Sequence, residues 1–400
     1  MPSPTVPPTS AKTVRLHYLD WLRVIAILIV FGYHAVHPFD MWGWHVKNIE
    51  QSLVLSITLT ILSLWGMPFF FLVAGSAGWF ALQRRTPNQY VSERIKRLLI
   101  PCIVTTILFY PLMLYFEWGN RLYLGTTTFS FADYFAKDWA FFVQLGINPM
   151  WFGIGRHLWF LGFLFAFALI TLPLFLWLKR DNGARFLAWL ASICEHRGGI
   201  LLLALPSIAI RFCLQPFFPE EHNWSDFTYQ MSFFILGYIL YADERFARII
   251  RRDGWLLFGS GTITLLAMFI MYAVGLPIFD WATNPAIPQF YLAHFLVGVI
   301  GFTYSLTMLF IGMRFLDFTN QWLKYAQEAV LPFFILHQPV IIVIAFYVVQ
   351  WQMDLLPKLV IVVTSSFIVT VGIYEFIIRR IAPLRTIFGM TKMIAPAHAG

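Results

Sequence analysis

The sequence predicts an all-α, polytopic membrane protein with about ten transmembrane helices and with both termini in the cytoplasm. Hydrophobic residues make up 59% of its 400 residues and charged residues only 12%, about half of what a soluble globular chain carries. A soluble fold of this length could not bury so much apolar surface. Ten apolar segments recur along the chain, and lysine and arginine are concentrated in alternate connections between them.

The apolar segments give the positions of the expected helices. A helix needs about 20 residues to cross the hydrocarbon of a bilayer, and most of the segments reach this length. The weakest candidate is 229–241, which is retained because the alternation of charge requires a crossing there. The expected spans are 19–38, 53–80, 98–116, 158–178, 199–218, 229–241, 255–277, 290–313, 329–350 and 357–378.

The distribution of basic residues predicts the orientation. The connections on the side of the N-terminus hold 21 of the 28 lysines and arginines, and those on the other side hold five. Basic connections face the cytoplasm in membrane proteins, so topology explains the net charge of +8, and we expect no nucleic-acid partner. We expect a disordered tail at 1–15, a transmembrane domain at 16–380 and a cytoplasmic tail at 381–400. No metal-ligand pattern such as H-E-x-x-H occurs in the sequence, so no metal site is expected.

Ionisable residues in the first span are the leading candidates for chemistry. An ionisable group in hydrocarbon costs at least about 2.5–3.5 kcal/mol and is by default a functional candidate. Arg23 and His34 are eleven positions apart, which places them on one helix face at a separation of about 16 Å. Asp20 lies near the same stripe. The alternative is that Asp20 and Arg23 form an interfacial pair and that His34 bonds a neighbouring helix.

Four further residues of the expected outer half are candidates for contact with a substrate. Arg211 lies in segment 199–218, and His157 and Trp159 stand at the outer end of 158–178. His337 lies in 329–350, where Pro339 leaves one backbone carbonyl without its donor. A structural role, such as anchoring at the rim of the membrane, remains the alternative for such residues.

The basic connection 81–97 has two interpretations. Its arginines and lysine can act as topology determinants that contact lipid headgroups. Alternatively, Arg94 and Arg97, which are three residues apart, share a helix face and can grip phosphates together with Arg85. In the preceding span, Gly75 and Ser76 predict a close-packed patch of small residues, not a serine nucleophile.

These elements together resemble the acyltransferase-3 family of integral membrane acyltransferases. The Arg23-x10-His34 spacing and the Arg94-x-x-Arg97 element are similar to two motifs of that family. FFFLVAGSAGWF resembles the family's F-F-x-x-S-G segment, although the serine follows the glycine here. HLWFLGFL and LHQP resemble the branch that contains glucan-biosynthesis protein C. The resemblance covers residues 16–380.

The resemblance implies transfer of an acyl group, with succinyl and acetyl both open, from cytoplasmic acyl-CoA to a hydroxyl of an extracytoplasmic carbohydrate. It implies no permanently bound cofactor, membrane lipid as a partner, and a place in the bacterial cytoplasmic membrane. His34 is the expected general base or acyl carrier, with Arg23 and Asp20 on its helix. The other expected roles are donor binding by Arg85, Arg94 and Arg97, and acceptor binding by His157, Trp159, Arg211 and His337. The alternative function is a transporter or flippase for an acylated or glycosylated lipid.

Overall fold

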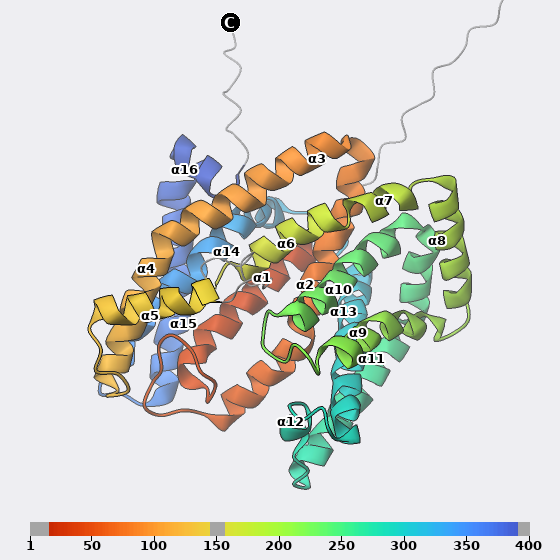
Figure 1. The fold of residues 1–400 in the computed structure, drawn as a ribbon. Coiled ribbons are helices and arrows are strands. Elements are labelled where there is room, and N and C mark those ends of the chain that lie inside the picture. The colour runs from red at the N-terminus through yellow and green to blue at the C-terminus, as the bar shows by residue number, and fades with distance from the viewer. Residues whose placement is uncertain (1–15, 145–156, 391–400) are drawn as a thin grey trace, which may run out of the picture.

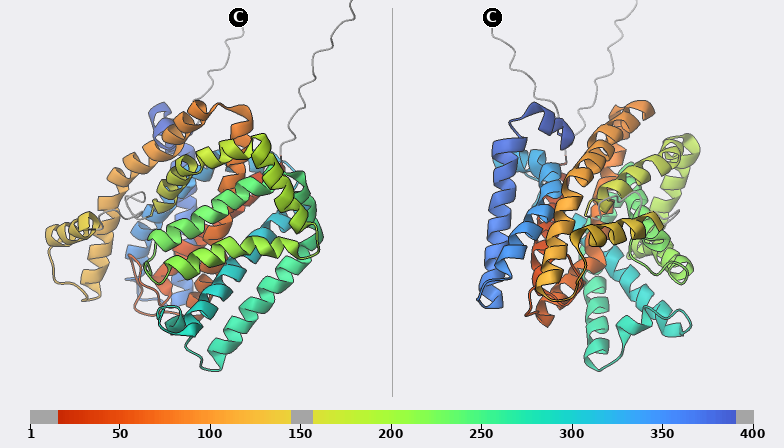
Figure 2. Two further views of the ribbon diagram at one scale, coloured as in Figure 1. Left: turned by 45° about the vertical axis from the view of Figure 1, so that its right-hand side comes forward. Right: turned by 60° about the vertical axis from the view of Figure 1, so that its left-hand side comes forward.

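The computed structural model describes residues 16–144 and 157–390, and these residues form helices joined by turns and irregular segments, with no strand among them (Figure 1). The helices run side by side as a bundle, which the two further views confirm (Figure 2). The all-α, multi-helix class predicted from the sequence is confirmed. The expected tail at 1–15 lies outside the described residues.

Within residues 16–144 and 157–390, seven continuous helical runs are long and apolar enough to cross a membrane. Each of them contains or closely matches one of the predicted spans, because a backbone in hydrocarbon must satisfy its hydrogen bonds within the segment. They are α1 (His17–Val36) with η1 (His37–Phe39), α2 (Leu53–Arg84), α3 (Pro87–Arg94) with η2 (Ile95–Leu99) and α4 (Ile100–Tyr123), α11 (Glu244–Ala273), α13 (Pro288–Phe315), α14 (Gln321–Val348), and α15 (Leu355–Ile373) with η5 (Tyr374–Ile378).

The remaining three predicted spans also coincide with helices. α6 (Trp159–Ile170) and α7 (Leu172–Leu178) form an eighth span if the bent pair is counted as one. Their axes differ by 48°, and Pro173 at the bend has no N–H to continue the helix. η4 (Gly199–Ala204) with α9 (Leu205–Leu214), and α10 (Trp224–Ala242), match the other two. These two are shorter or more polar, so the total of ten crossings remains a prediction.

Four shorter helices lie outside the predicted spans. They are α5 (Phe131–Gln144), α8 (Asp181–Cys194), α12 (Ile278–Trp281) and α16 (Ala382–Ile387). α16 falls within the segment expected to be a C-terminal tail, and it packs against α4 and η5. The described part of that segment is therefore docked onto the bundle.

A close helix contact joins α2 to α10 through two glycines. A Cβ added to Gly75 would lie 1.9 Å from the carbonyl oxygen of Phe234, and one added to Gly237 would lie 1.9 Å from that of Leu72. Ser76 is fully buried and donates to the Val73 carbonyl at 2.6 Å. The predicted close-packed patch of small residues is confirmed.

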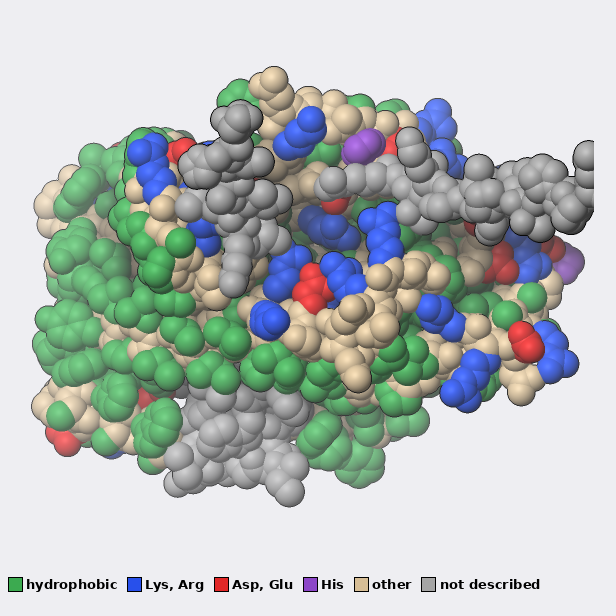
Figure 3. Space-filling model, turned by 90° about the horizontal axis from the view of Figure 1, so that it is seen from above, with side chains coloured by type: hydrophobic (Ala, Val, Ile, Leu, Met, Phe, Trp, Pro, Cys, Tyr) green, Lys and Arg blue, Asp and Glu red, His purple; other side chains and the backbone are tan. Residues whose placement is uncertain are grey.

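The basic connections meet on one face of the bundle, which we call the basic face. Lys and Arg side chains gather on it (Figure 3), and α3, α7 and α16 lie along it in Figure 1. Six hydrogen bonds tie these connections together: Tyr18–Tyr241 (3.0 Å), Trp21 to the Phe318 carbonyl (3.0 Å), Lys179 to that of Leu82 (2.8 Å), Arg245 to that of Ala188 (3.0 Å), Arg97 to that of Gly389 (3.3 Å) and Arg385–Glu328 (2.9 Å). These bonds support the prediction that the basic connections share one side of the bundle. That this side faces the cytoplasm remains a prediction.

Candidate functional site

A cluster of imidazole rings lies where α1 packs against α14, towards the face opposite the basic face. The ring centroid of His34 is 5.3 Å from that of His337 and 6.1 Å from that of His37. α1 contacts α2, α13, α14 and α15, so its last turn lies inside the bundle. The structure therefore joins two predicted site residues, His34 and His337, that are far apart in the sequence.

The hydrogen bonds of His337 fix its tautomer. Its Nδ1 lies 2.5 Å from the Phe334 carbonyl, so Nδ1 carries the hydrogen and donates it. A neutral imidazole has one donor and one acceptor, which leaves Nε2 as an acceptor. That Nε2 is buried and has no hydrogen-bond partner among the described residues. Pro339 has no N–H and so leaves the Ile335 carbonyl without its helical donor. His337 does not bond that carbonyl; it donates to the carbonyl of Phe334 instead.

His34 also has a buried ring nitrogen, Nδ1, that finds no hydrogen-bond partner within the described part of the chain. The remainder of the residue is partly accessible. Buried polar groups without a partner are uncommon in folded proteins and each needs an explanation. A hydroxyl group or water molecule between the helices would satisfy these nitrogens, so the arrangement suits a site that receives a polar ligand.

The loop after α1 covers the histidines with a tryptophan. The ring of Trp44 is nearly parallel to that of His37, at 5.6 Å and 13°, and to that of His34, at 6.2 Å and 21°. The buried carboxylate of Asp40 lies 2.8 Å from Nδ1 of His37. Trp44 and Asp40 lie outside the apolar spans, so the sequence alone predicts no role for either of them.

Lys47 holds this loop in place. Its Nζ donates to the carbonyls of His37 and Asp40, both at 2.6 Å, and to the Asp40 carboxylate at 2.5 Å. Its backbone N–H donates to the Asn120 side chain at 2.9 Å, and Asn120 donates back to its carbonyl at 3.2 Å. Burial lowers the pKa of Lys47, and the ion pair with Asp40 opposes that shift. The loop is therefore rigidly attached both to α1 and to α4.

A second group of contacts attaches the loop to α5. His45 bonds the carboxylate of Glu117 on α4. The same carboxylate accepts from the hydroxyl of Tyr134 on α5 at 2.7 Å and pairs with Arg121 at 3.1 Å. Glu117 is 4% exposed, so the carboxylate that joins the loop to α4 and α5 lies beneath the surface.

Of the expected acceptor-binding residues besides His337, one lies near His34 and the other two have their described contacts elsewhere. His157 is buried and lies close enough to His34 for an electrostatic interaction. Trp159 begins α6, and its ring contacts that of His222 at 4.1 Å. Arg211 contacts residues of α10 and α13 instead of the histidine cluster.

Arg23 and Asp20 lie at the other end of α1. Nη1 of Arg23 is 3.1 Å from the Asp20 carboxylate, so the pair exists, as both interpretations of the sequence anticipate. Because α1 is continuous between Arg23 and His34, the two residues remain about 16 Å apart. Arg23 therefore lies towards the basic face and cannot touch the atoms that His34 touches.

The three arginines expected to bind the donor have different partners. Arg85 and Arg97 share the carboxylate of Glu93, at 2.9 Å and 3.4 Å. Arg94 instead lies over the ring of Tyr90, 4.7 Å from its centroid, and has no ion pair with a carboxylate among the described residues. Arg94 is therefore the member of this group whose charge is most available to a phosphate.

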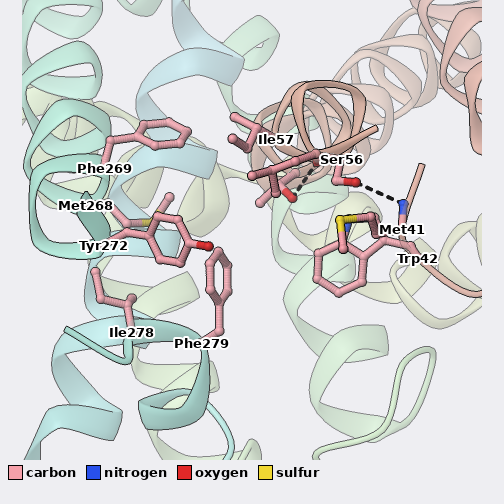
Figure 4. Close-up of a pocket in the computed structure, with 11 residues that line it drawn as sticks. Met41, Trp42, Ser56, Ile57, Met268, Phe269, Tyr272, Ile278 and Phe279 are labelled. Carbon is pink, nitrogen blue, oxygen red and sulfur yellow. Dashed lines mark hydrogen bonds between the residues drawn. The ribbon is translucent and has the colours of Figure 1, made fainter. Parts of the chain in front are cut away.

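Two hollows lie away from the histidine cluster. One, of about 220 Å³, lies between the start of α2 and the helices α11 and α12, and most of its lining is apolar (Figure 4). It includes Trp42, Ile57, Met268 and Tyr272. The other, of about 540 Å³, surrounds His196 and Arg197 after α8. Neither is lined by the predicted site residues.

Comparison with known proteins identifies the family. A family model described as an acyltransferase domain matches residues 16–375, which is nearly the whole chain. The chain belongs to the acyltransferase-3 family. Its several apolar helices and this family support an integral, multi-pass membrane protein.

The curated relatives include proteins named glucans biosynthesis protein C from Salmonella schwarzengrund (strain CVM19633) and Salmonella heidelberg (strain SL476). Each is 22% identical over 236 residues, which cover 58% of this chain and 59% of the relative. The match thus spans under two thirds of the relatives' length. No solved structure matches this chain.

Proposed function

We propose that the protein transfers an acyl group, succinyl or acetyl, from cytoplasmic acyl-CoA to a hydroxyl of an extracytoplasmic carbohydrate. The observation that carries this proposal is the pair of buried imidazoles, His34 and His337, whose Nδ1 and Nε2 respectively have no partner among the described residues. The name of the relatives, glucans biosynthesis protein C, supports a glucan as the acceptor. A cytosolic donor and an extracytoplasmic acceptor place the enzyme in the bacterial cytoplasmic membrane.

The chemistry of the acceptor explains why imidazole is suited to this role. A sugar hydroxyl has a high pKa and is a poor nucleophile, so a base within hydrogen-bond reach accelerates its attack on a thioester. An acyl-imidazole intermediate on His34 is equally compatible with the residue type. Trp44 offers a flat apolar surface beside His34, which suits one face of a sugar ring. His157 and Trp159 extend this side of the site, and the bundle around it limits competing hydrolysis.

The basic face supports a donor site for CoA. Guanidinium groups form strong charge-assisted hydrogen bonds with phosphate. No carboxylate within the described ranges competes for the charge of Arg94. Arg85 and Arg97 lie beside it, although their shared partner Glu93 competes with a phosphate for their charge. Arg23, held by Asp20, lies between this face and His34 along α1, where it would orient the acyl chain. The thioester must then extend along α1 to the histidines.

Release of CoA by the purified protein in nanodiscs tests the proposal. With acetyl-CoA or succinyl-CoA and a glucan acceptor, His34→Ala should lower the rate about 10²–10⁴-fold, the usual contribution of a general base. His17→Ala, on the basic-face end of the same helix, is the matched control and should retain activity. Acyl transfer at the wild-type rate by a folded His34→Ala variant would reject the assignment.

The mass of the intact protein distinguishes the two mechanisms. After incubation with acyl-CoA alone, a covalent route adds one acyl group to the wild type and none to His34→Ala. A direct route leaves both masses unchanged while CoA release still requires the acceptor.

A further inference from the structure

A second polar cluster lies away from the histidine cluster, where α9, α10 and α13 meet. Nη1 of Arg211 is 3.3 Å from Nδ1 of His294, and the guanidinium lies over the ring of Tyr229, 4.3 Å from its centroid. His294 is 4% exposed and Tyr229 is 1% exposed. Three helices thus bring a cation, an imidazole and a phenol together below the surface.

The partners of Arg211 among the described residues supply no negative charge. Nε2 of His294 lies 3.1 Å from the Ala282 carbonyl and donates to it, so Nδ1 is the acceptor that receives the Arg211 N–H. His294 is therefore neutral. No carboxylate of the described residues forms an ion pair with Arg211. Asp226, one turn before Tyr229, instead accepts from the His222 backbone and from Gln230.

Two donors of the cluster have no acceptor oxygen among the described residues. Nε of Arg211 and the hydroxyl of Tyr229 are both buried, and neither makes a hydrogen bond of normal geometry within residues 16–144 and 157–390. The two groups lie close enough to each other to interact, but the Tyr229 hydroxyl, itself a donor, has no acceptor there. A guanidinium without a carboxylate and a hydroxyl without an acceptor are costly at membrane depth, where no water replaces the missing acceptor. One oxyanion would accept from both donors and would also neutralise the charge.

The depth of the cluster indicates where such an anion comes from. Arg211 is three residues before the end of α9, Tyr229 is five after the start of α10, and His294 is six after the start of α13. These helix ends lie on the face opposite the basic face, so the cluster lies about 5–9 Å below them. Tyr291 and Phe295 beside His294 are 40% and 43% exposed, as expected for a surface in contact with lipid.

We propose that Arg211, Tyr229 and His294 form an anion-binding site that takes one singly charged oxyanion, either a phosphate diester of an anionic lipid or a carboxylate of a soluble molecule. Arg211 supplies the charge and Nε–H, and Tyr229 supplies a hydroxyl. His294 fixes the guanidinium by accepting from its other side. The site is independent of acyl transfer at His34.

Thermal unfolding of the purified protein in nanodiscs tests the proposal. One arm replaces phosphatidylcholine stepwise with phosphatidylglycerol, and the other adds sodium acetate or succinate to phosphatidylcholine nanodiscs at constant ionic strength. A saturable rise of the unfolding temperature in the first arm identifies a lipid phosphate, and one in the second arm identifies a soluble carboxylate. No saturable rise in either arm would overturn the proposal.

Variants connect the effect to these residues. Arg211→Met should abolish the anion-dependent rise, and Tyr229→Phe should raise the half-saturating anion concentration at least tenfold while leaving the charge intact. Arg314→Met, on the exposed basic-face end of α13, is the matched control for a lost cation and should respond as the wild type does. If Arg211→Met does not fold, Tyr229→Phe alone decides. A Tyr229→Phe response equal to that of the wild type would overturn the site.

Discussion

Replacing Gly75 with alanine should destabilise the protein, because the contact of α2 with α10 leaves no room for a methyl group. The added Cβ would lie 1.9 Å from the Phe234 carbonyl oxygen, and real Cβ atoms essentially never approach closer than 3.0 Å. The two helices must therefore separate locally by at least about 1.1 Å. Backbone atoms form the obstacle, so no change of side-chain rotamer relieves the clash.

The expected cost is about 1–3 kcal/mol in the free energy of unfolding, which is typical for an overpacked core. Gly237 meets the Leu72 carbonyl across the same contact, also at 1.9 Å. The separation that accommodates one methyl group also admits the other. Gly75→Ala and Gly237→Ala should therefore be non-additive, with the double variant losing clearly less than the sum of the two single losses.

Unfolding in mixed micelles with increasing sodium dodecyl sulfate measures these free energies. Gly66→Ala is the matched control, because Gly66 lies on the same helix and a Cβ there would meet nothing within 4 Å. That variant should be neutral or more stable by about 0.5–1 kcal/mol. Equal losses for Gly75→Ala and Gly66→Ala would refute the reasoning from the helix contact.

Three further predictions concern the site. Trp44→Ala should raise the KM for the carbohydrate acceptor about 5–30-fold, equivalent to about 1–2 kcal/mol of lost ring contact, and leave the KM for acyl-CoA unchanged; equal rises in both constants would argue against an acceptor platform. Lys47→Met should cost about 3–5 kcal/mol of stability because Asp40 remains buried without its cation, and adding Asp40→Asn should recover part of the loss in the same unfolding assay. Arg94→Ala should weaken inhibition by free CoA, whereas Glu93→Gln should strengthen it by releasing two arginines. Stronger inhibition of Arg94→Ala, or weaker inhibition of Glu93→Gln, would exclude this donor site.

The positions of most helices could be predicted from the sequence because hydrocarbon imposes a simple rule. Every backbone group must bond within its own segment, so a long apolar run such as 290–313 becomes a helix whatever its neighbours are. Even the weak segment 229–241 lies in a 19-residue helix, α10. The short helices α8 and α12 were not expected, because nothing in an apolar scan distinguishes an amphipathic surface helix from a loop.

The candidate site could be predicted only in part. The spacing of Arg23 and His34 on one helix is local, so periodicity reveals it. The pairing of His34 with His337 depends on which helices pack together, and helix periodicity carries no such information. Trp44 and Asp40 were missed for the same reason, because the fold of a connecting loop decides their place over the histidines.

The contacts of α1 have a consequence for how the chain enters the membrane. Its partners α13, α14 and α15 are made last, and His337 is translated about 300 residues after His34. At about 5–20 residues per second, ribosomal synthesis of that stretch takes about 15–60 s. During this interval the face of α1 that carries His34 is not yet covered by α14, so the first helix meets α2 well before the histidine cluster can form.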